Sequence, residues 1–336
     1  MKIAFFEVED WQKDYLEKKV SFAESVSFFR SSLQDTDLAS FDFEAISLFI
    51  GSTLTSDLMA KFPNLKLVTT RSTGFDHIAK DFLRERGTAL GYVPGYGDNT
   101  VAEFTFGLIL SLSRRLYDAV HRIREAGDFS FEGLRGFDLK GRTLGVVGAG
   151  RIGCEVLRIA QGFEMNVVAY DAFPKPETAA ACHFAYVSFE DLLARSDIIT
   201  LHVPYSVSSH HLINSDNVSK IKRGAILINT SRGAVVETSA LVQALRDGIL
   251  SGAGLDVLEE EGLIRDEKEL LSGQLDALKL RTVLGNHVLM DMPNVIVTPH
   301  MAFNTTEAIE RILDTDIENI KTFLETGKAK YSIPTV

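Results

Sequence analysis

The sequence is poor in cysteine, because Cys154 and Cys182 are the only two among 336 residues. Two cysteines are too few for a disulfide framework, and no His, Asp or Glu group has zinc-like local spacing, so no metal site is predicted. The chain also lacks an apolar run near the ~18 residues of a membrane-spanning helix, and its first residues lead into acids instead of a signal-cleavage site. We therefore expect a cytoplasmic protein with no membrane partner.

Positive charge is also in short supply. The chain carries 35 Lys and Arg against 46 Asp and Glu, a formal net charge of −11. This balance disfavours nucleic acids and anionic membranes as partners. The composition, 45% hydrophobic and 24% charged, is that of an ordinary globular protein, and the length exceeds what one core usually organises. We expect two domains.

The stretch from Thr143 to Asp171 has the pattern of a strand, a glycine turn, a helix and a second strand. In its G-x-G-x-x-G turn, Gly148 permits the tight bend, Gly150 lets the backbone approach a pyrophosphate, and Gly153 lets helix and strand pack closely. Phosphates bind well at a helix N-terminus, and a carboxylate about 20 residues further on, here Asp171, binds the adenosine ribose. The stretch predicts a dinucleotide site. The alternative is a strand-helix-strand crossover whose glycines serve packing alone.

Apolar runs of strand length recur along the whole chain, at 2–6, 46–50, 65–70, 143–147, 166–170, 198–203, 225–229, 252–257 and 295–298. Runs of this kind, separated by helical patterns, are typical of strands buried on both faces of a parallel sheet, so the predicted fold class is α/β. A capping box at Thr100 and Glu103 predicts one long helix that ends near Gly127. An Asx cap at Asn304 predicts a second, which ends before Gly327.

Polar residues follow the carboxyl ends of several predicted strands, where open α/β sheets bind ligands. Thr73 and Gly74 come after the strand at 65–70 and are candidate anion donors, with a plain turn as the alternative. A denser set follows the later strands: Arg232, Asp256, Glu261 and His300. We expect this set to lie on one rim of the second sheet.

In these motifs the chain resembles the D-isomer-specific 2-hydroxyacid dehydrogenase family, most of all its D-lactate dehydrogenase branch. The motifs lie at 71–76, 93–103, 148–153, 201–204, 228–233, 254–257 and 298–300. The resemblance implies two Rossmann-like domains with doubly wound parallel sheets, an active-site cleft between them, and a homodimer. It implies a substrate domain at 1–99 plus 301–336 and an NAD-binding domain at 100–300. The chain departs from the wider family pattern at Phe104, at Gly262 and in an insert between Glu261 and Val295. These departures bear on which substrate is used and not on the chemistry.

The resemblance also implies roles for single residues. Arg232, Glu261 and His300 match the catalytic arginine, acid and histidine. The residues that would bind the substrate are Thr73, Gly74, Tyr96, Arg232 and Phe303, although Tyr96 and Phe303 have filling of the interdomain core as their alternative. The residues that would bind NAD are Gly148, Gly150, Arg151, Ile152, Gly153, Asp171, His202, Val203, Pro204, Thr230, Ser231 and Asp256. Histidines 210 and 211 are expected to face solvent.

These residues divide the tasks of reducing a 2-keto acid. Arg232, a planar cation, would bind the substrate carboxylate and polarise the keto oxygen. His300 would supply the proton, and Glu261 would orient its ring and stabilise the protonated form. The carboxylate of Asp171 would repel the 2′-phosphate of NADPH, so NADH is the expected cofactor.

The predicted function is thus NADH-dependent reduction of a small 2-keto acid, with pyruvate as the best guess, to the D-2-hydroxy acid, and the reverse reaction. One alternative is a dehydrogenase for another 2-hydroxy acid of the longer-chain, glyoxylate or phosphoglycerate type. The other, from a different class, is an NAD-sensing binding protein that resembles the corepressors built on this fold.

Overall fold

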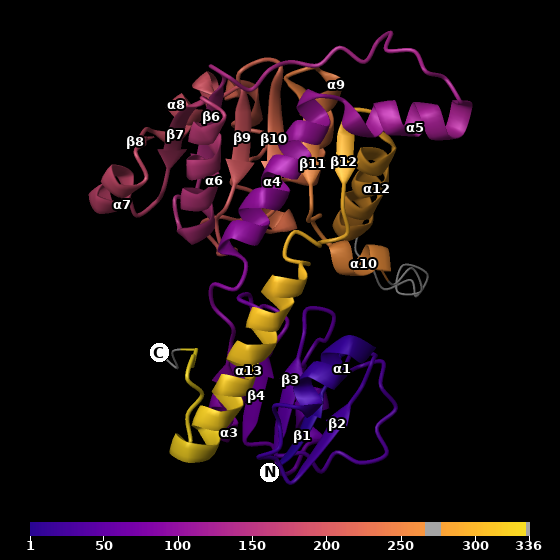
Figure 1. The fold of residues 1–336 in the computed structure, drawn as a ribbon, viewed down its shortest axis with the longest axis vertical. Coiled ribbons are helices and arrows are strands. Elements are labelled where there is room, and N and C mark those ends of the chain that lie inside the picture. Colours follow the sequence, from indigo (N-terminus) through magenta and orange to yellow (C-terminus); the bar gives the residue numbers. More distant parts are fainter. Residues whose placement is uncertain (266–276, 334–336) are drawn as a thin grey trace. The chain divides into compact units, whose positions relative to one another are not determined.

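A computed structural model describes residues 1–265 and 277–333. The chain forms two compact units, the first made of residues 1–96 and 305–336 and the second of residues 97–304 (Figure 1). The prediction drew the boundaries at 99/100 and 300/301, and the roles it gave to the two domains and the cleft between them stay predictions. No helix among the described residues is long and apolar enough to cross a membrane.

The first unit contains a five-stranded parallel sheet in the order β2-β1-β3-β4-β5. Its strands are β1 (Lys2–Phe5), β2 (Ser25–Phe28), β3 (Ala45–Leu48), β4 (Leu67–Thr70) and β5 (Ala89–Gly91). The sequence pattern predicted β1, β3 and β4 but missed the two edge strands. β5 has only 3 residues, and Ser-Val-Ser-Phe in β2 is only partly buried, so neither carries the continuous apolar signal of a central strand.

Helices cover both faces of this sheet. On one face, α1 (Asp10–Glu17) and α13 (Thr306–Thr326) enclose a core that includes Ile3, Leu16 and Leu313. On the other face lie α2 (Ser56–Ala60) and α3 (Lys80–Arg86). The C-terminal helix therefore completes the core of the N-terminal segment.

The N-terminal cap of α13 differs by one residue from the prediction. The hydroxyl of Thr305, and not the side chain of Asn304, accepts a hydrogen bond from the amide of Ala308 at 3.2 Å. The predicted end is confirmed, because Gly327 closes the helix in the left-handed region at φ 75°.

The second unit contains a seven-stranded parallel sheet in the order β12-β11-β10-β9-β6-β7-β8. Its strands are β6 (Thr143–Val147), β7 (Asn166–Tyr170), β8 (Ala185–Tyr186), β9 (Ile198–Leu201), β10 (Ala225–Asn229), β11 (Leu250–Leu255) and β12 (Val295–Val297). Only the two-residue β8 was missed. The predicted α/β class with parallel sheets is confirmed. The order reverses between β6 and β9, and this is the point where doubly wound sheets bind nucleotides.

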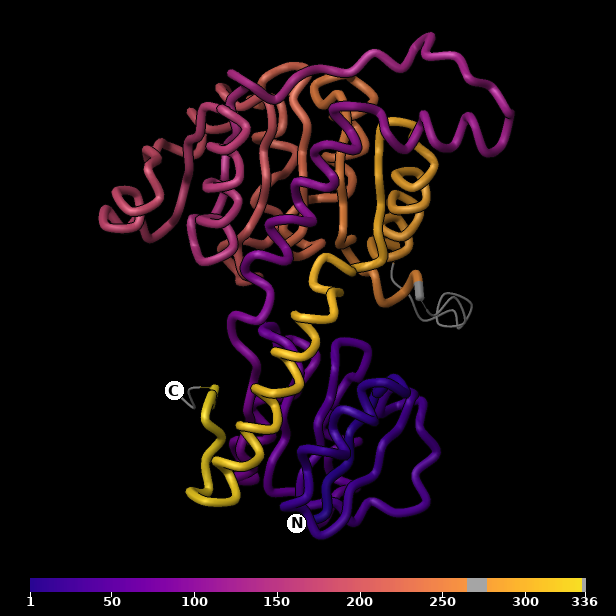
Figure 2. The backbone as a smooth tube through the Cα atoms, in the orientation of Figure 1, coloured from indigo at the N-terminus to yellow at the C-terminus, as the bar shows by residue number. Residues whose placement is uncertain are grey.

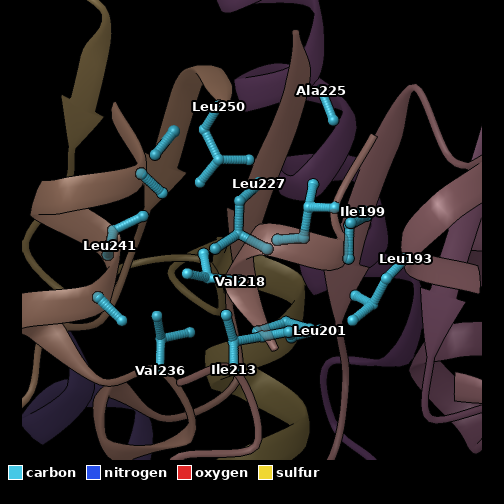
Figure 3. Close-up of a cluster of buried hydrophobic side chains, with 14 of the residues drawn as sticks. Leu193, Ile199, Leu201, Ile213, Val218, Ala225, Leu227, Val236, Leu241 and Leu250 are labelled. Atoms are coloured by element: carbon cyan, nitrogen blue, oxygen red, sulfur yellow. The ribbon is translucent and has the colours of Figure 1, made fainter. Parts of the chain in front are cut away.

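Both faces of this sheet are also covered. The helices are α4 (Asp98–Ser113), α5 (Leu116–Ala126), α6 (Arg151–Gly162), α7 (Pro176–Ala181), α8 (Phe189–Arg195), α9 (Thr238–Arg246), α10 (Glu261–Arg265) and α12 (Ala277–Asp291), with 3₁₀ turns at Val218–Lys220 and Gly233–Val235. On one face, α4 and α6 pack over the central strands. On the other, Leu193 of α8 and Leu241 of α9 meet Leu201, Leu227 and Leu250 (Figure 3).

The long helix predicted from Thr100 to Gly127 is wrong in two respects. It begins at Asp98, so Thr100 lies in its first turn, and it breaks at Arg115, whose φ of 51° cannot continue a right-handed helix. A distant segment packs against the break, because the amide of Phe137 donates to the carbonyl of Ser113 at 2.9 Å. The tube in Figure 2 shows the chain running out along α5 and returning past this point to β6.

The predicted insert between Glu261 and Val295 is occupied in part by α10 and α12. Its residues 266–276 lie outside the described residues.

Candidate active site

The glycine turn lies between the carboxyl ends of β6 and β9. Gly148 has a φ of 96°, and a Cβ there would lie 2.6 Å from the carbonyl oxygen of His202. The amide of His202 in turn donates to the carbonyl of Val147 at 2.8 Å. Only glycine allows these two backbones to approach so closely.

Gly153 and Gly150 differ in what lies next to their α-carbons. A Cβ on Gly153 would lie 2.1 Å from the carbonyl oxygen of Gly148, so this glycine serves helix packing. A Cβ on Gly150 would meet no atom within 4 Å. Gly150 is also the N-cap of α6, and no side chain caps that helix end. An open space in front of a helix N-terminus suits a pyrophosphate, so the turn fits a dinucleotide.

The side chains next to these glycines have partners within the protein. The guanidinium of Arg151 donates to Asp98 at 2.7 Å, and Ile152 packs against the core under α6. Their role in binding NAD stays a prediction.

Asp171 lies beside the turn, directly after β7. Its carboxylate accepts hydrogen bonds from the amide of Ala149 at 3.0 Å and from the amide of Phe173 at 2.9 Å. The turn and the predicted ribose-binding acid are thus joined directly.

His202 and its neighbours form the opposite wall of the turn. The Nε2 atom of His202 lies 2.9 Å from the hydroxyl of Thr200, and burial lowers the pKa of His202 to about 3, so its ring is neutral. Val203 packs beside Gly148, and the carbonyl of Pro204 accepts a hydrogen bond from Ser209 at 2.7 Å.

Thr230 and Ser231, two of the predicted NAD-binding residues, follow β10, and Thr230 lies close to α4. The hydroxyl of Thr230 is 3.1 Å from that of Thr105, and the hydroxyl of Ser231 donates to Asn229 at 2.8 Å. Neighbouring side chains thus already engage both hydroxyls.

Strands β10, β11 and β12 are neighbours whose ends are in register, since Asn229 pairs with Leu255 and Leu255 with Val297. The loops that carry Arg232, Glu261 and His300 therefore leave the sheet at the same edge. The Nδ1 atom of His300 lies 2.6 Å from Oε1 of Glu261. The other carboxylate oxygen of Glu261, Oε2, accepts a hydrogen bond from the amide of Leu258 at 3.2 Å. The structure joins this predicted pair.

Asp256 shapes the turn that bears His300. Its buried carboxylate accepts hydrogen bonds from the hydroxyl of Thr298 at 2.6 Å and from the amides of Met301 and Ala302 at 2.9 and 2.8 Å. Burial raises the pKa of Asp256 above its usual value. The predicted contact with the nicotinamide stays a prediction, whereas this bonding is a role that sequence reasoning missed.

Arg232 is half-buried and extended in backbone conformation. Its guanidinium donates to the carbonyl of Ser231 at 2.8 Å, and its own carbonyl accepts from the side chain of Asn229 at 2.9 Å. Phe303 belongs to the same unit and follows the His300 turn.

The remaining predicted substrate contacts lie in the first unit. Thr73 and Gly74 follow the carboxyl end of β4, and the hydroxyl of Thr73 donates to the carbonyl of Val93 at 2.8 Å. The carbonyl of Tyr96 accepts from Arg311 at 2.8 Å. Their role as substrate contacts stays a prediction.

One expectation about the other histidines is wrong. His211 does not simply face solvent, because its Nε2 atom lies 2.6 Å from Oε1 of Glu259. The neighbouring His210 is exposed, as expected. Within residues 1–265 and 277–333, no group of three or more His, Cys, Asp or Glu side chains is placed to hold a metal ion.

Residues 106–302 match the family model described as "D-isomer specific 2-hydroxyacid dehydrogenase, NAD binding domain". The match covers more than half of the chain, and the chain belongs to this family of NAD-dependent dehydrogenases. Its cofactor is NAD, as predicted.

Three relatives illustrate the breadth of the family. A "2-hydroxyacid dehydrogenase homolog" of Haemophilus influenzae is 35% identical over 98% of this chain and 97% of its own. An "Aromatic 2-oxoacid reductase" of Clostridium sporogenes is 34% identical over 86% of this chain and 85% of its own. The crystal structure of D-lactate dehydrogenase from Aquifex aeolicus, complexed with NAD and lactic acid, has a TM-score of 0.85 and 33% identity and covers 99% of this chain and 100% of that one.

Proposed function

We propose that this protein reduces a small 2-keto acid, with pyruvate as the best substrate, to the D-2-hydroxy acid with NADH, and catalyses the reverse oxidation. The main support is the pairing of His300 with Glu261 at 2.6 Å on loops that leave the sheet beside the Arg232 loop. The same sheet carries the glycine turn at its switch point.

Bound NADH supplies the hydride for the carbonyl carbon of the keto acid. The guanidinium of Arg232 binds the substrate carboxylate and polarises the keto oxygen, since its planar fork makes two hydrogen bonds at once. The amides of Thr73 and Gly74 complete the carboxylate site. The two contacts of Arg232, with the carboxylate and the keto oxygen, and the two amide contacts together place the carbonyl carbon for reaction.

His300 supplies the proton. Its Nδ1 atom faces Glu261, so Nε2 is the atom that donates to the developing alkoxide in reduction and accepts the hydroxyl proton in oxidation. Glu261 holds the ring in this orientation and stabilises the imidazolium. The Asp256 carboxylate holds the turn that carries the ring.

Asp171 sets the preference for NADH over NADPH. Its carboxylate lies against the glycine turn, where the ribose of the adenosine half binds, and it would repel a 2′-phosphate.

The size of the substrate depends on Tyr96 and Phe303, which we place beside its side chain. Relatives at 34% and 33% identity have names that refer to an aromatic 2-oxoacid and to D-lactate, so overall identity does not separate the two substrate classes. Two aromatic rings leave space for a methyl group. A longer chain is disfavoured only modestly, because one methylene changes selectivity by about 1–3 kcal/mol.

The test is an assay of the purified protein with D-lactate and L-lactate plus NAD, followed by a series of 2-keto acids with NADH. We expect turnover of the D-isomer alone and the highest kcat/KM with pyruvate. A higher value for glyoxylate or a long or aromatic keto acid would assign the alternative substrate class. No NADH oxidation with any keto acid would support the NAD-sensing binding protein instead.

We also propose that the protein is a cytoplasmic homodimer that pairs through α5 and the segment after it. None of the residues of α5 is buried, yet Leu116, Val120 and Ile123 form an apolar stripe along it. Phe129 and Phe131 are 89% and 90% exposed. A second copy would cover this surface, which is too apolar to face water alone. Analytical ultracentrifugation should show a dimer, and Val120→Asp should yield monomers.

A further inference from the structure

The second unit contains another histidine–carboxylate pair, outside the proposed catalytic set. Oε1 of Glu259 is 2.6 Å from Nε2 of His211, and Oε2 accepts hydrogen bonds from the amide of Thr238 at 3.2 Å and from its hydroxyl at 2.8 Å. The side chain of Glu259 is only 14% exposed. The carboxylate therefore holds three donors from two different segments.

The pair joins two of the loops that form the site. The backbone amide of His211 donates to the carbonyl of Ala234 at 2.8 Å, in the loop that carries Arg232, while its ring binds Glu259, in the loop that carries Glu261. Thr238 ends the Arg232 loop and begins α9. The middle of the Arg232 loop, through His211, and its C-terminal end at Thr238 are thus tied to Glu259.

The two loops also touch through their backbones. A Cβ on Gly233 would lie 2.0 Å from the carbonyl carbon of Leu258 and 2.3 Å from the amide nitrogen of Glu259. Gly233 directly follows Arg232. Since the peptides are in contact there, a shift of Glu259 must move the backbone beside Arg232.

The same shift reaches the catalytic pair. Glu259 precedes Glu261 by two residues, and Glu260 between them has a φ of 55°, so the chain turns sharply at this point. The carbonyl of Glu259 is held from the other side by the side chain of Asn286, which is fully buried in α12 and donates at 2.7 Å.

We propose that Glu259 and His211 are positioning residues that fix the Arg232 loop relative to the Glu261–His300 pair. This inference rests on the proposed function, in which Arg232 and His300 act on the same substrate. The proposal gives neither Glu259 nor His211 a contact with the reactants. Their effect is to hold the guanidinium and the imidazole in one geometry, and a misplacement of about 1 Å costs about 10²-fold in rate.

The test compares Glu259→Gln and His211→Gln, singly and together, with Glu260→Gln as the control. Glu260 is an exposed neighbouring carboxylate with a long contact of 3.9 Å to Lys279. We expect Glu259→Gln and His211→Gln each to lower kcat/KM for the keto acid by about 10- to 100-fold. The KM for NADH should stay within about twofold of wild type, because the glycine turn is untouched, and the double variant should lose little more than either single one.

Hydrogen exchange supplies a readout that does not depend on activity. The amides of Val235 and Val236 donate to the carbonyls of Arg232 and Gly233 within the Arg232 loop. Their exchange should be about tenfold faster in Glu259→Gln and unchanged in Glu260→Gln.

The outcomes separate this inference from the proposed function. A wild-type protein without keto-acid reduction refutes the proposed function, while loop exchange still tests the pairing. If exchange is unchanged in Glu259→Gln, Glu259 does not hold the Arg232 loop in place. Faster exchange with an unchanged kcat/KM overturns the positioning role.

Discussion

The two histidine–carboxylate pairs of the second unit have nearly the same geometry and different surroundings. His300 with Glu261 and His211 with Glu259 are each separated by 2.6 Å, and both histidines have a left-handed backbone, at φ 54° and 48°. Such a conformation costs about 1–3 kcal/mol in a residue other than glycine and persists only where neighbours hold it.

The difference lies in the nitrogen that each ring uses. His300 binds its carboxylate through Nδ1, which directs Nε2 to the proposed substrate, whereas His211 uses Nε2 and thereby ties two loops together. Besides its histidine, Glu261 accepts a hydrogen bond from the amide of Leu258, while Glu259 holds both donors of Thr238. A short histidine–carboxylate contact therefore does not by itself identify a proton donor, because the other ring nitrogen must also face the reactants.

The largest predicted effect separates the two histidines directly. His300→Gln should lower kcat for keto-acid reduction by about 10³-fold, since glutamine cannot transfer a proton, and general acid catalysis contributes about 10²- to 10⁴-fold. His211→Gln should cost at least tenfold less. Steady-state NADH oxidation measures both, with circular dichroism as the folding control. Equal losses in the two variants would remove the distinction between the pairs.

Arg232→Lys tests the group that the positioning pair is proposed to serve. The variant keeps the charge but loses the planar fork, so we expect kcat/KM for the keto acid to fall on the order of 10²-fold, with the KM for NADH little changed. The matched control is Arg158→Lys on α6, which keeps the positive charge beside Glu155 at an exposed position outside the proposed site. A fall of less than threefold in Arg232→Lys would argue against a bidentate carboxylate contact.

A smaller effect is expected at the carboxylate beside the glycine turn. Asp171→Ala removes a charged hydrogen-bond acceptor and the repulsion of a 2′-phosphate, so the KM for NADH should rise about tenfold and the preference over NADPH should shrink. The KM for the keto acid should not change. If the NADH preference survives intact, Asp171 does not bind the ribose.

His202 offers a contrast to both pairs, because its described partner is the hydroxyl of Thr200 and its pKa is lowered to about 3 by burial. Below pH 6.5 the unfolded chain takes up a proton here that the folded protein does not, so folding stability falls as the pH decreases and is fully present above 6.5. His202 as a whole residue is only half-buried, which makes ~1.4 kcal/mol per pH unit an upper limit. Denaturant unfolding between pH 7 and 5 of wild type and His202→Asn should show a shallower pH slope in the variant.

Sequence patterns were informative where the physical signal is local. The glycine spacing from Gly148 to Gly153 predicted a strand-turn-helix unit, and β7 and β10 have the predicted limits, because buried strands read as continuous apolar runs. The break at Arg115 carries no such signal. It lies beside a hydrogen bond from Phe137 to Ser113, and Phe137 lies far along the chain.

The sequence by itself determined the fold class, the dinucleotide turn and the order of the motifs that mark the family, because each arises from residues close together in the chain. Only the tertiary structure decided that Glu259 meets His211, whereas the pairing of Glu261 with His300 was already predicted from the resemblance. The register of β9, β10, β11 and β12 brings His211, Arg232, Glu259 and His300 to one edge from separate segments, and the contact of Gly233 with Glu259 couples them. Such partners are set by packing between strands, and local sequence carries no record of them.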